Sequence, residues 1–197
     1  MTSPPAPGAG KSALRERSLA VRSARPEAER TAASAAIVGT LLQRLATVRA
    51  FAAYVPEETE PGHGRLPAAY TQLGARVLLP VVPPAGSELA WAVDTGQLAP
   101  GRFGLLEPVG PRLGPTALST ADVIVVPALA VARDGMRLGR GGGYYDRALR
   151  HARPDAVVVA LVFDDEFVEE LPSEPHDHRV DAVVTPSGGW QALPVGH

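Results

Sequence analysis

Short apolar runs recur along this chain, and they limit its possible folds more than any other feature. The strongest are ADVIVVPALAV at residues 121–131 and AVVVALVF at residues 156–163. Their apolar residues are consecutive rather than alternating, which is typical of strands that are covered on both faces. Segments with helical spacing of apolar residues separate these runs. The alternation predicts an α/β fold, a three-layer α/β/α sandwich with a mostly parallel central sheet.

The same patterns place the individual elements. Helical spacing covers residues 11–48, interrupted at Pro26, and further helices are expected at 66–73, 144–152 and 164–171. Strands are expected at 49–56, 76–82, 88–94, 121–131, 156–163 and 179–186. Residues 96–120 are rich in Gly and Pro and are expected to form a long surface loop. We expect a single domain over residues 11–197, preceded by a disordered tail at residues 1–10.

Composition narrows the class of protein. The net charge is −2, so there is no broad basic field and nucleic acid is not an expected partner. The apolar runs are too short to span a bilayer, and the first ten residues lack the pattern of an export signal. No cysteine is present, which fits a reducing compartment. We therefore expect a cytoplasmic enzyme or binding protein with no membrane partner.

The segment RLGRGGGYYDR, at residues 137–147, concentrates glycine and arginine. Glycines allow backbone N–H groups to turn toward an anion, and Arg137 and Arg140 would pair with phosphoryl oxygens. The alternative is an ordinary surface turn that leads into an amphipathic helix. Ligands of parallel sheets bind beyond the carboxyl ends of the strands, where the loops 57–64, 133–143 and the region of Asp177 are expected. This placement favours a phosphate site.

Two other glycine patterns fit known phosphate loops poorly. GAGKS at residues 8–12 resembles the end of a P-loop, but Pro5 stands where that motif needs glycine. The glycines of GRGGGYYD lack the offsets of the dinucleotide fingerprint, so a mononucleotide is the better interpretation. Lys11 is the one lysine among nineteen basic residues, which hints at a position that needs a compact ammonium.

Three acidic residues are candidate ligands. Asp146, in the first turn of a predicted helix, either compensates the helix dipole or binds Mg²⁺ beside phosphates. Asp177, in PHDHRVD, offers a second carboxylate, whereas the histidines of that segment lack a third zinc ligand at suitable spacing. Glu60 is either a solvated loop acid or, in a pocket, an acceptor for the amide and amino edge of a pterin-like ring.

Together these motifs resemble the 5-formyltetrahydrofolate cyclo-ligase family, also called 5,10-methenyltetrahydrofolate synthetases. The resemblance rests on DVIVVPALAVARDGMRLGRGGGYYDRAL, supported in order by KSALR, YVPEETEPG, FGLLEP and PSEPHDHRVDAVVT. It implies an α/β/α fold and an ATP- and Mg²⁺-dependent cyclisation of 5-formyltetrahydrofolate to 5,10-methenyltetrahydrofolate, with release of ADP and phosphate. A catalytically weak folate-binding paralogue and a small-molecule kinase remain as alternatives.

The resemblance also implies roles for individual residues. The expected catalytic residues are Arg140, Tyr144 and Lys11. The expected ATP-binding residues are Lys11, Ser12, Ala13, Leu14, Arg15, Arg137, Leu138, Gly139, Arg140, Gly141, Gly142, Gly143, Tyr144 and Tyr145. The expected folate-binding residues are Val55, Glu60, Arg140, Gly141, Gly142, Gly143 and Tyr144. Asp146 and Asp177 would bind Mg²⁺.

The chain departs from the family pattern at two places. Where the family commonly has Gly and then Phe-Asp after the central proline, this chain has Ala128 and then Val131 and Ala132. Gly142 stands where some members have lysine. The first departure changes packing and the second removes a charge, so both bear on rate and affinity.

Overall fold

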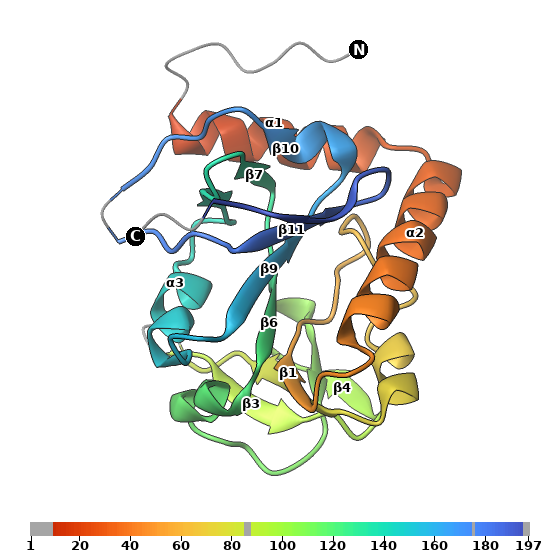
Figure 1. The fold of residues 1–197 in the computed structure, drawn as a ribbon, viewed down its shortest axis with the longest axis vertical. Coiled ribbons are helices and arrows are strands. Elements are labelled where there is room, and N and C mark those ends of the chain that lie inside the picture. The colour runs from red at the N-terminus through yellow and green to blue at the C-terminus, as the bar shows by residue number, and fades with distance from the viewer. Residues whose placement is uncertain (1–9, 85–87, 175, 195–197) are drawn as a thin grey trace.

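The central element is a seven-stranded sheet, shown in the computed structural model in Figure 1. The structure describes residues 10–84, 88–174 and 176–194, so most of the expected tail lies outside the described residues. The strands lie in the order β12 (Gly189–Ala192), β11 (Ala182–Thr185), β9 (Val157–Leu161), β6 (Val123–Pro127), β1 (Ala50–Ala52), β2 (Arg76–Val81) and β3 (Ala90–Val93). The pairings from β11 to β2 are parallel, and the edge strands β12 and β3 pair antiparallel.

Both faces of this sheet are buried, as the apolar runs predict. In β9, Val158 and Ala160 face one apolar cluster, and Val159 and Leu161 face the other. The helix α2 (Glu27–Leu45) packs on the second face, with Ile37 and Leu41 fully buried. The 3₁₀ helix η1 (Ala68–Leu73) also covers this face, where a helix over 66–73 is expected.

The first face is covered by short helices, η3 (Pro115–Thr120), α3 (Tyr144–Ala148) and η4 (Leu149–His151). The structure therefore confirms the three-layer α/β/α sandwich. Helix α1 (Lys11–Ala24) lies across the top of the sheet in Figure 1, beside β7 (Ala130–Ala132) and β10 (Phe167–Val168). Among the described residues, no helix has the length and apolar character needed to cross a bilayer.

Three element predictions are wrong. Residues 121–131 do not form one strand, because the chain turns after Pro127 and continues as β7 (Ala130–Ala132) in a second sheet, in the order β10-β7-β8. Residues 96–120 are not a plain loop but contain η3 and a hairpin of β4 (Leu98–Pro100) and β5 (Leu106–Pro108), joined through η2 (Arg102–Gly104). Residues 164–171 are not a helix but the single turn η5 (Asp164–Glu166) followed by β10 (Phe167–Val168). Strands β12 and β8 (Arg137–Leu138) were not expected.

Candidate active site

A cavity of about 530 Å³ opens beyond the carboxyl ends of β1, β2 and β6, the three adjacent central strands. After β1 the chain adds β2 and β3 on one side, and it then returns to add β6 on the other side of β1. The loops that follow β1 and β6 diverge at such a reversal of strand order, which leaves a crevice between them. The cavity volume lies in the range that accommodates small ligands. The expected loops 57–64 and 133–143 and the region of Asp177 all contribute lining residues.

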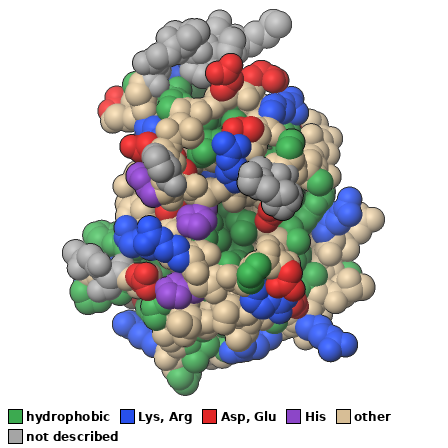
Figure 2. Space-filling view, turned by 60° about the vertical axis from the view of Figure 1, so that its left-hand side comes forward, with side chains coloured by type: hydrophobic (Ala, Val, Ile, Leu, Met, Phe, Trp, Pro, Cys, Tyr) green, Lys and Arg blue, Asp and Glu red, His purple; other side chains and the backbone are tan. Residues whose placement is uncertain are grey.

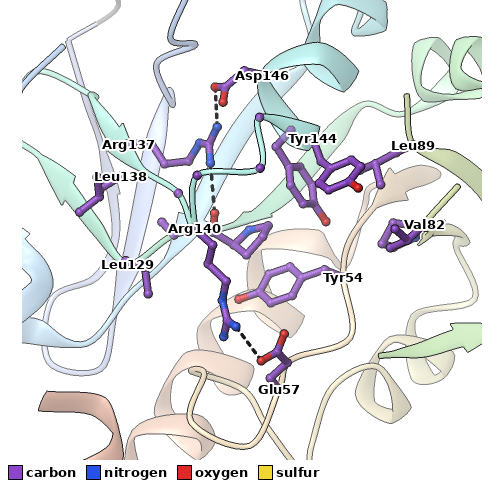
Figure 3. Close-up of a pocket in the computed structure, with 18 of the residues that line it drawn as sticks. Tyr54, Glu57, Val82, Leu89, Leu129, Arg137, Leu138, Arg140, Tyr144 and Asp146 are labelled. Atoms are coloured by element: carbon purple, nitrogen blue, oxygen red, sulfur yellow. Dashed lines mark hydrogen bonds and ion pairs between the residues drawn. The ribbon is translucent and has the colours of Figure 1, made fainter. Parts of the chain in front are cut away.

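The glycine segment forms the polar side of this cavity. Arg137, which is buried, donates from Nη2 to the Asp146 carboxylate at 2.7 Å and from Nη1 to the Pro127 carbonyl at 3.5 Å (Figure 3). The Nε atom of Arg137 is buried with no hydrogen-bond partner among the described residues. Arg137 lines the cavity, so its guanidinium places a positive charge at this wall.

Glycines let the loop that follows Arg137 curve closely around the cavity. Gly141 and Gly143 have φ values of +100° and +65°, a region that side chains with a Cβ rarely adopt. Helix α3 begins at Tyr144 as predicted, but it is only five residues long, so its dipole is small. Arginines, rather than a helix dipole, therefore supply the positive side of the site.

Arg140 spans the mouth of the cavity. Its Nη1 pairs with Glu57 at 2.8 Å and its Nη2 with Glu60 at 3.2 Å, so it joins the glycine loop to the loop after β1. The Glu60 side chain is 7% exposed, and its Oε2 accepts from the Glu57 backbone N–H at 2.9 Å. Burial raises the pKa of Glu60. The Glu57 N–H and the charge of Arg140 lower this pKa, but their effect is smaller than that of burial. Glu60 is thus a buried, oriented carboxylate rather than a solvated loop acid.

Helix α1 brings two further cations to the cavity. Lys11 Nζ lies 2.6 Å from both Glu174 Oε2 and Asp177 Oδ2. Burial opposes protonation of Lys11, but the hydrogen bonds to these two carboxylates outweigh it and raise its pKa. Arg15 donates from Nε to the Gly139 carbonyl at 2.9 Å, so α1 is held directly against the glycine loop.

The remaining wall of the cavity is apolar or aromatic. Tyr54 is buried beside Glu60, and burial raises its pKa well above the ordinary value, so its hydroxyl remains protonated. Tyr144 lies between the glycine loop and Leu89 in Figure 3, and burial also raises the pKa of Tyr145. The wall is completed by Val55, Pro80, Val82, Leu89, Phe103, Leu105, Leu106, Ala128, Leu129 and Leu138. Figure 2 shows charged side chains of both signs, and histidines, around apolar side chains on one face of the molecule.

Most of the predicted site residues are brought together here. Those that line the cavity are Lys11, Arg15, Val55, Glu60, Arg137, Leu138, Gly139, Arg140, Gly141, Gly142, Gly143, Tyr144, Tyr145, Asp146 and Asp177. Ser12 and Ala13 are exposed and are not part of the lining. Leu14 packs instead into a small apolar cluster with Leu129, Ala130 and Leu138. Its side chain anchors α1 beneath the glycine loop.

Sequence reasoning missed several lining residues. Tyr54 and Glu57 lie within the motif YVPEETEPG, yet only tertiary structure shows that they flank Glu60 and Arg140. Phe103, at the tip of the β4–β5 hairpin, is 73% exposed and has a φ of +57°. Phe103 opens the motif FGLLEP, but an aromatic residue in a Gly-flanked segment does not by itself indicate a ligand contact.

The carboxylates that the sequence assigns to Mg²⁺ both lie at this cavity. Asp146 accepts from Arg137, and Asp177 accepts from Lys11 and from the Glu174 backbone N–H. Burial of Asp177 works against ionisation, but the hydrogen bonds from Lys11 and Glu174 lower its pKa. Asp177 lies in a group with Glu174 and His176, whose possible ligand atoms are all within 4.8 Å of one another, whereas Asp146 is not part of this group. Carboxylates are ligands that Mg²⁺ prefers in proteins, so Asp177 and Glu174 fit that ion, with Asp146 elsewhere on the same cavity wall.

Comparison with known proteins identifies the family of the chain. The model of the 5-formyltetrahydrofolate cyclo-ligase family matches residues 7–186. A 5-formyltetrahydrofolate cyclo-ligase of Mycolicibacterium smegmatis is 45% identical over 188 residues, which cover 93% of this chain and 97% of the relative. The chain belongs to this family. A second cyclo-ligase, from Escherichia coli, is 38% identical over 60% of this chain and 67% of its own length.

Solved structures agree with the family assignment. The 5,10-methenyltetrahydrofolate synthetase of Aquifex aeolicus has a TM-score of 0.77 and 29% identity, covering 95% of this chain and 94% of its own. A synthetase of Mycoplasma pneumoniae, at 20% identity and a TM-score of 0.71, shares the fold; it covers 89% of this chain and 98% of its own. The family and its cyclo-ligase members indicate that this chain is an enzyme with 5-formyltetrahydrofolate cyclo-ligase activity.

Proposed function

We propose that this chain catalyses the ATP- and Mg²⁺-dependent cyclisation of 5-formyltetrahydrofolate to 5,10-methenyltetrahydrofolate, with release of ADP and phosphate. The observation that carries the proposal is the cavity itself, which is lined by the arginines of a glycine loop, a buried carboxylate and aromatic side chains. Such a cavity can hold a polyanion at one end and a flat heterocycle with N–H donors at the other. Because both substrates belong to the cell interior, we also propose a cytoplasmic location.

The polyanion end would bind ATP. Arg137 and Arg140 would pair with phosphoryl oxygens, Lys11 would act as a point charge, and the N–H groups of residues 139–143 would add donors. In the structure these three cations are paired with carboxylates. Phosphate oxygens would replace those carboxylates as partners, so the cations are held near their working positions without being left unpaired.

The carboxylate end would bind the folate. Glu60 can accept two N–H bonds from the amide and amino edge of a pterin, which is a bidentate and orienting contact. Val55 lies on the same loop, and Tyr144 offers an aromatic ring in the wall of the cavity. The formyl group would then project toward the glycine loop, where the terminal phosphate of ATP is bound.

The reaction needs two displacements. The formyl oxygen attacks the terminal phosphorus of ATP, a P–O bond forms, and the bond to ADP breaks. N10 of the folate then attacks the activated formyl carbon and loses its proton, and the C–O bond to phosphate breaks to leave the methenyl bridge. Arg140, Lys11 and Tyr144 would act by orienting the reactants and neutralising charge, which is the main demand of phosphoryl transfer.

Asp146 and Asp177 would hold Mg²⁺ at the phosphate end of the cavity. When bound, the ion would supply charge neutralisation for the phosphate oxygens. Asp146 and Asp177 would then bind the ion instead of Arg137 and Lys11, and these two cations could pair with phosphate.

The test is direct, because methenyltetrahydrofolate has its own near-ultraviolet absorbance band. The purified protein with 5-formyltetrahydrofolate, ATP and Mg²⁺ should produce this band, with ADP and phosphate released in equal amounts. Folate binding without the band would instead identify a folate-binding paralogue. A phosphorylated product that persists would identify a kinase.

Replacing Lys11 with alanine should impair nucleotide use more than folate use. The change removes one charge-assisted contact to phosphate and leaves Asp177 without its ammonium partner. We expect the KM for ATP to rise about 10- to 100-fold, because such a contact contributes roughly 1.5–3 kcal/mol, whereas the KM for the folate changes little. Steady-state kinetics with each substrate varied in turn measures both, and Lys11→Arg should retain part of the affinity. Equal increases in the two constants would contradict a phosphate role.

Replacing Asp146 with asparagine should raise the Mg²⁺ concentration required for half-maximal activity. The neutral amide is a weaker ligand for a hard cation than a carboxylate, and we expect a shift of about tenfold or more. Mg²⁺-dependent binding of a non-hydrolysable ATP analogue should shift in parallel. Asp177→Asn should act in the same direction, more weakly. Asp155→Asn, at an exposed carboxylate paired with Arg153, is the control that should leave the metal titration unchanged. A normal metal titration for Asp146→Asn would reduce this residue to a counter-ion for Arg137.

A further inference from the structure

Arg22 is the most deeply buried charged residue among those the structure describes, with 0% exposure. It follows Lys11 and Arg15 on the same side of α1, because positions i, i+4 and i+11 share one helix face. Its Nε and Nη2 each lie 2.7 Å from one of the two carboxylate oxygens of Glu166. This is a planar, two-bond pair between α1 and the turn η5.

Arg22 also binds the floor of the cavity. Its Nη2 donates to the Ala128 carbonyl at 2.6 Å, at the turn where the chain leaves β6 for β7. On either side of this bond, the Pro127 carbonyl accepts from Arg137, and the Leu129 N–H donates to the Leu138 carbonyl at 2.7 Å. The turn 127–129 is therefore held by α1, by the phosphate-side arginine and by β8, and all three of its residues line the cavity.

Stability alone does not account for this arrangement. A buried ion pair is often no more stabilising than apolar side chains of similar volume. Here Nη1 of Arg22 is additionally buried without a hydrogen-bond partner among the described residues, which is a further cost. An apolar pair could fill the same space without that cost, but it could not bind the Ala128 carbonyl.

We propose that Arg22, oriented by Glu166, is a positioning residue of the active site: it fixes the turn 127–129 and, through it, Arg137 and the start of the glycine loop. This inference rests on the proposed function, since it assigns Arg22 to the binding of the nucleotide phosphates at that loop. Arg22 does not line the cavity and acts through the backbone that it holds.

The charge of Arg22 has a second consequence at the folate end. It lowers the pKa of Glu60 and so partly offsets the effect of burial. The other groups that act on Glu60 are Arg140 and Glu57 from the neighbouring loops, and Glu60 in turn acts on the hydroxyls of Tyr54 and Tyr145. Removing Arg22 should therefore move the acid limb of the pH profile upward, which a purely structural residue would not do.

The test uses a double variant that removes both charges together, Arg22→Met with Glu166→Gln. Removing one partner alone would leave an unpaired buried charge, whereas the neutral pair should fold, and the glutamine oxygen can still accept from the Phe163 N–H. Arg25→Met is the matched control. Arg25 also lies at the end of α1 and pairs with Asp165 of the same turn at 2.6 Å, but no bond connects it to residues 127–129.

Three measurements are made on each protein: kcat/KM for cyclisation across pH, the affinity for a non-hydrolysable ATP analogue with Mg²⁺, and the amide exchange rate of Leu129. For the double variant we expect kcat/KM to fall about 10- to 100-fold, since displacements of about 1 Å can cost that much. We also expect weaker analogue binding, faster Leu129 exchange and an acid limb at higher pH. Arg25→Met should stay within about twofold of the unmodified protein.

A folded double variant that matches Arg25→Met in analogue affinity and Leu129 exchange would overturn the proposal. If the double variant does not fold, Arg22→Lys decides, because lysine keeps the charge but lacks the planar fork. Unchanged Leu129 exchange in Arg22→Lys would also overturn it. Analogue binding and amide exchange do not require turnover. They therefore test this inference even if the unmodified protein fails to cyclise the folate, which would reject the proposed function instead.

Discussion

Replacing Gly141 with valine should reduce kcat/KM for cyclisation by about 10³-fold, or roughly 4 kcal/mol of transition-state stabilisation. Gly141 has a φ of +100°, and a Cβ there would lie 3.3 Å from Cζ of Arg15. A branched side chain would displace both the loop and the α1 arginine that supports it. The proposed contacts between the loop and the phosphate would then be lost.

The melting temperature separates this effect from unfolding. Gly141 is exposed, so the variant should lose only the small cost of a non-glycine residue at positive φ, about 1–2 kcal/mol. Gly74→Val is the matched control, because Gly74 has a φ of +63°, has open space around it and does not line the cavity. Both variants should melt at similarly reduced temperatures, and only Gly141→Val should lose activity. A Gly141→Val protein with a near-normal cyclisation rate would show that the segment is an ordinary surface turn.

The layers of the fold were predictable because each central strand carries its own signal. Val158, Val159 and Ala160 are apolar in succession, and burial on both faces is what such a run requires. The break after Pro127 carries no comparable signal, since Ala128, Leu129 and Ala130 are as apolar as the strand before them. The turn is fixed by distant partners, the guanidinium of Arg22 and the carbonyl of Leu138.

The hairpin over residues 98–108 was not predicted, for a similar reason. Its Gly- and Pro-rich sequence is typical of a loop, yet the buried Glu107 carboxylate accepts from the Val82 N–H at 2.9 Å and anchors β5 next to β2. At the site, the glycine segment was evident because one short stretch supplies both the loop and its arginines. Tyr54, Glu57 and Arg22 acquire their roles only through contacts with residues far away in the sequence, and no local pattern encodes those contacts.

Replacing Glu60 with glutamine should lower kcat/KM for the folate about 10²- to 10³-fold while leaving the affinity for ATP nearly unchanged. A carboxylate accepts two N–H bonds, whereas an amide accepts one and opposes the second donor with its own NH₂ group. The loss of one charge-assisted bond and the unpaired donor together account for an effect of this size. Glu57→Gln is the matched control, since Glu57 also pairs with Arg140 but is 39% exposed.

The pH dependence gives this prediction a second readout. Burial raises the pKa of Glu60, and its proposed role requires the ionised form, so kcat/KM should rise with pH through that raised pKa. The contribution of Glu60 to stability depends on pH in the opposite direction, because the folded state holds the Glu60 proton more tightly than the unfolded chain does. This stabilisation is present at low pH and is lost as pH rises through the folded-state pKa. Glu60→Gln should lack this acid limb, and Glu57→Gln should keep it. An acid limb that persists unchanged in Glu60→Gln would assign it to another group and remove Glu60 from the binding of the folate.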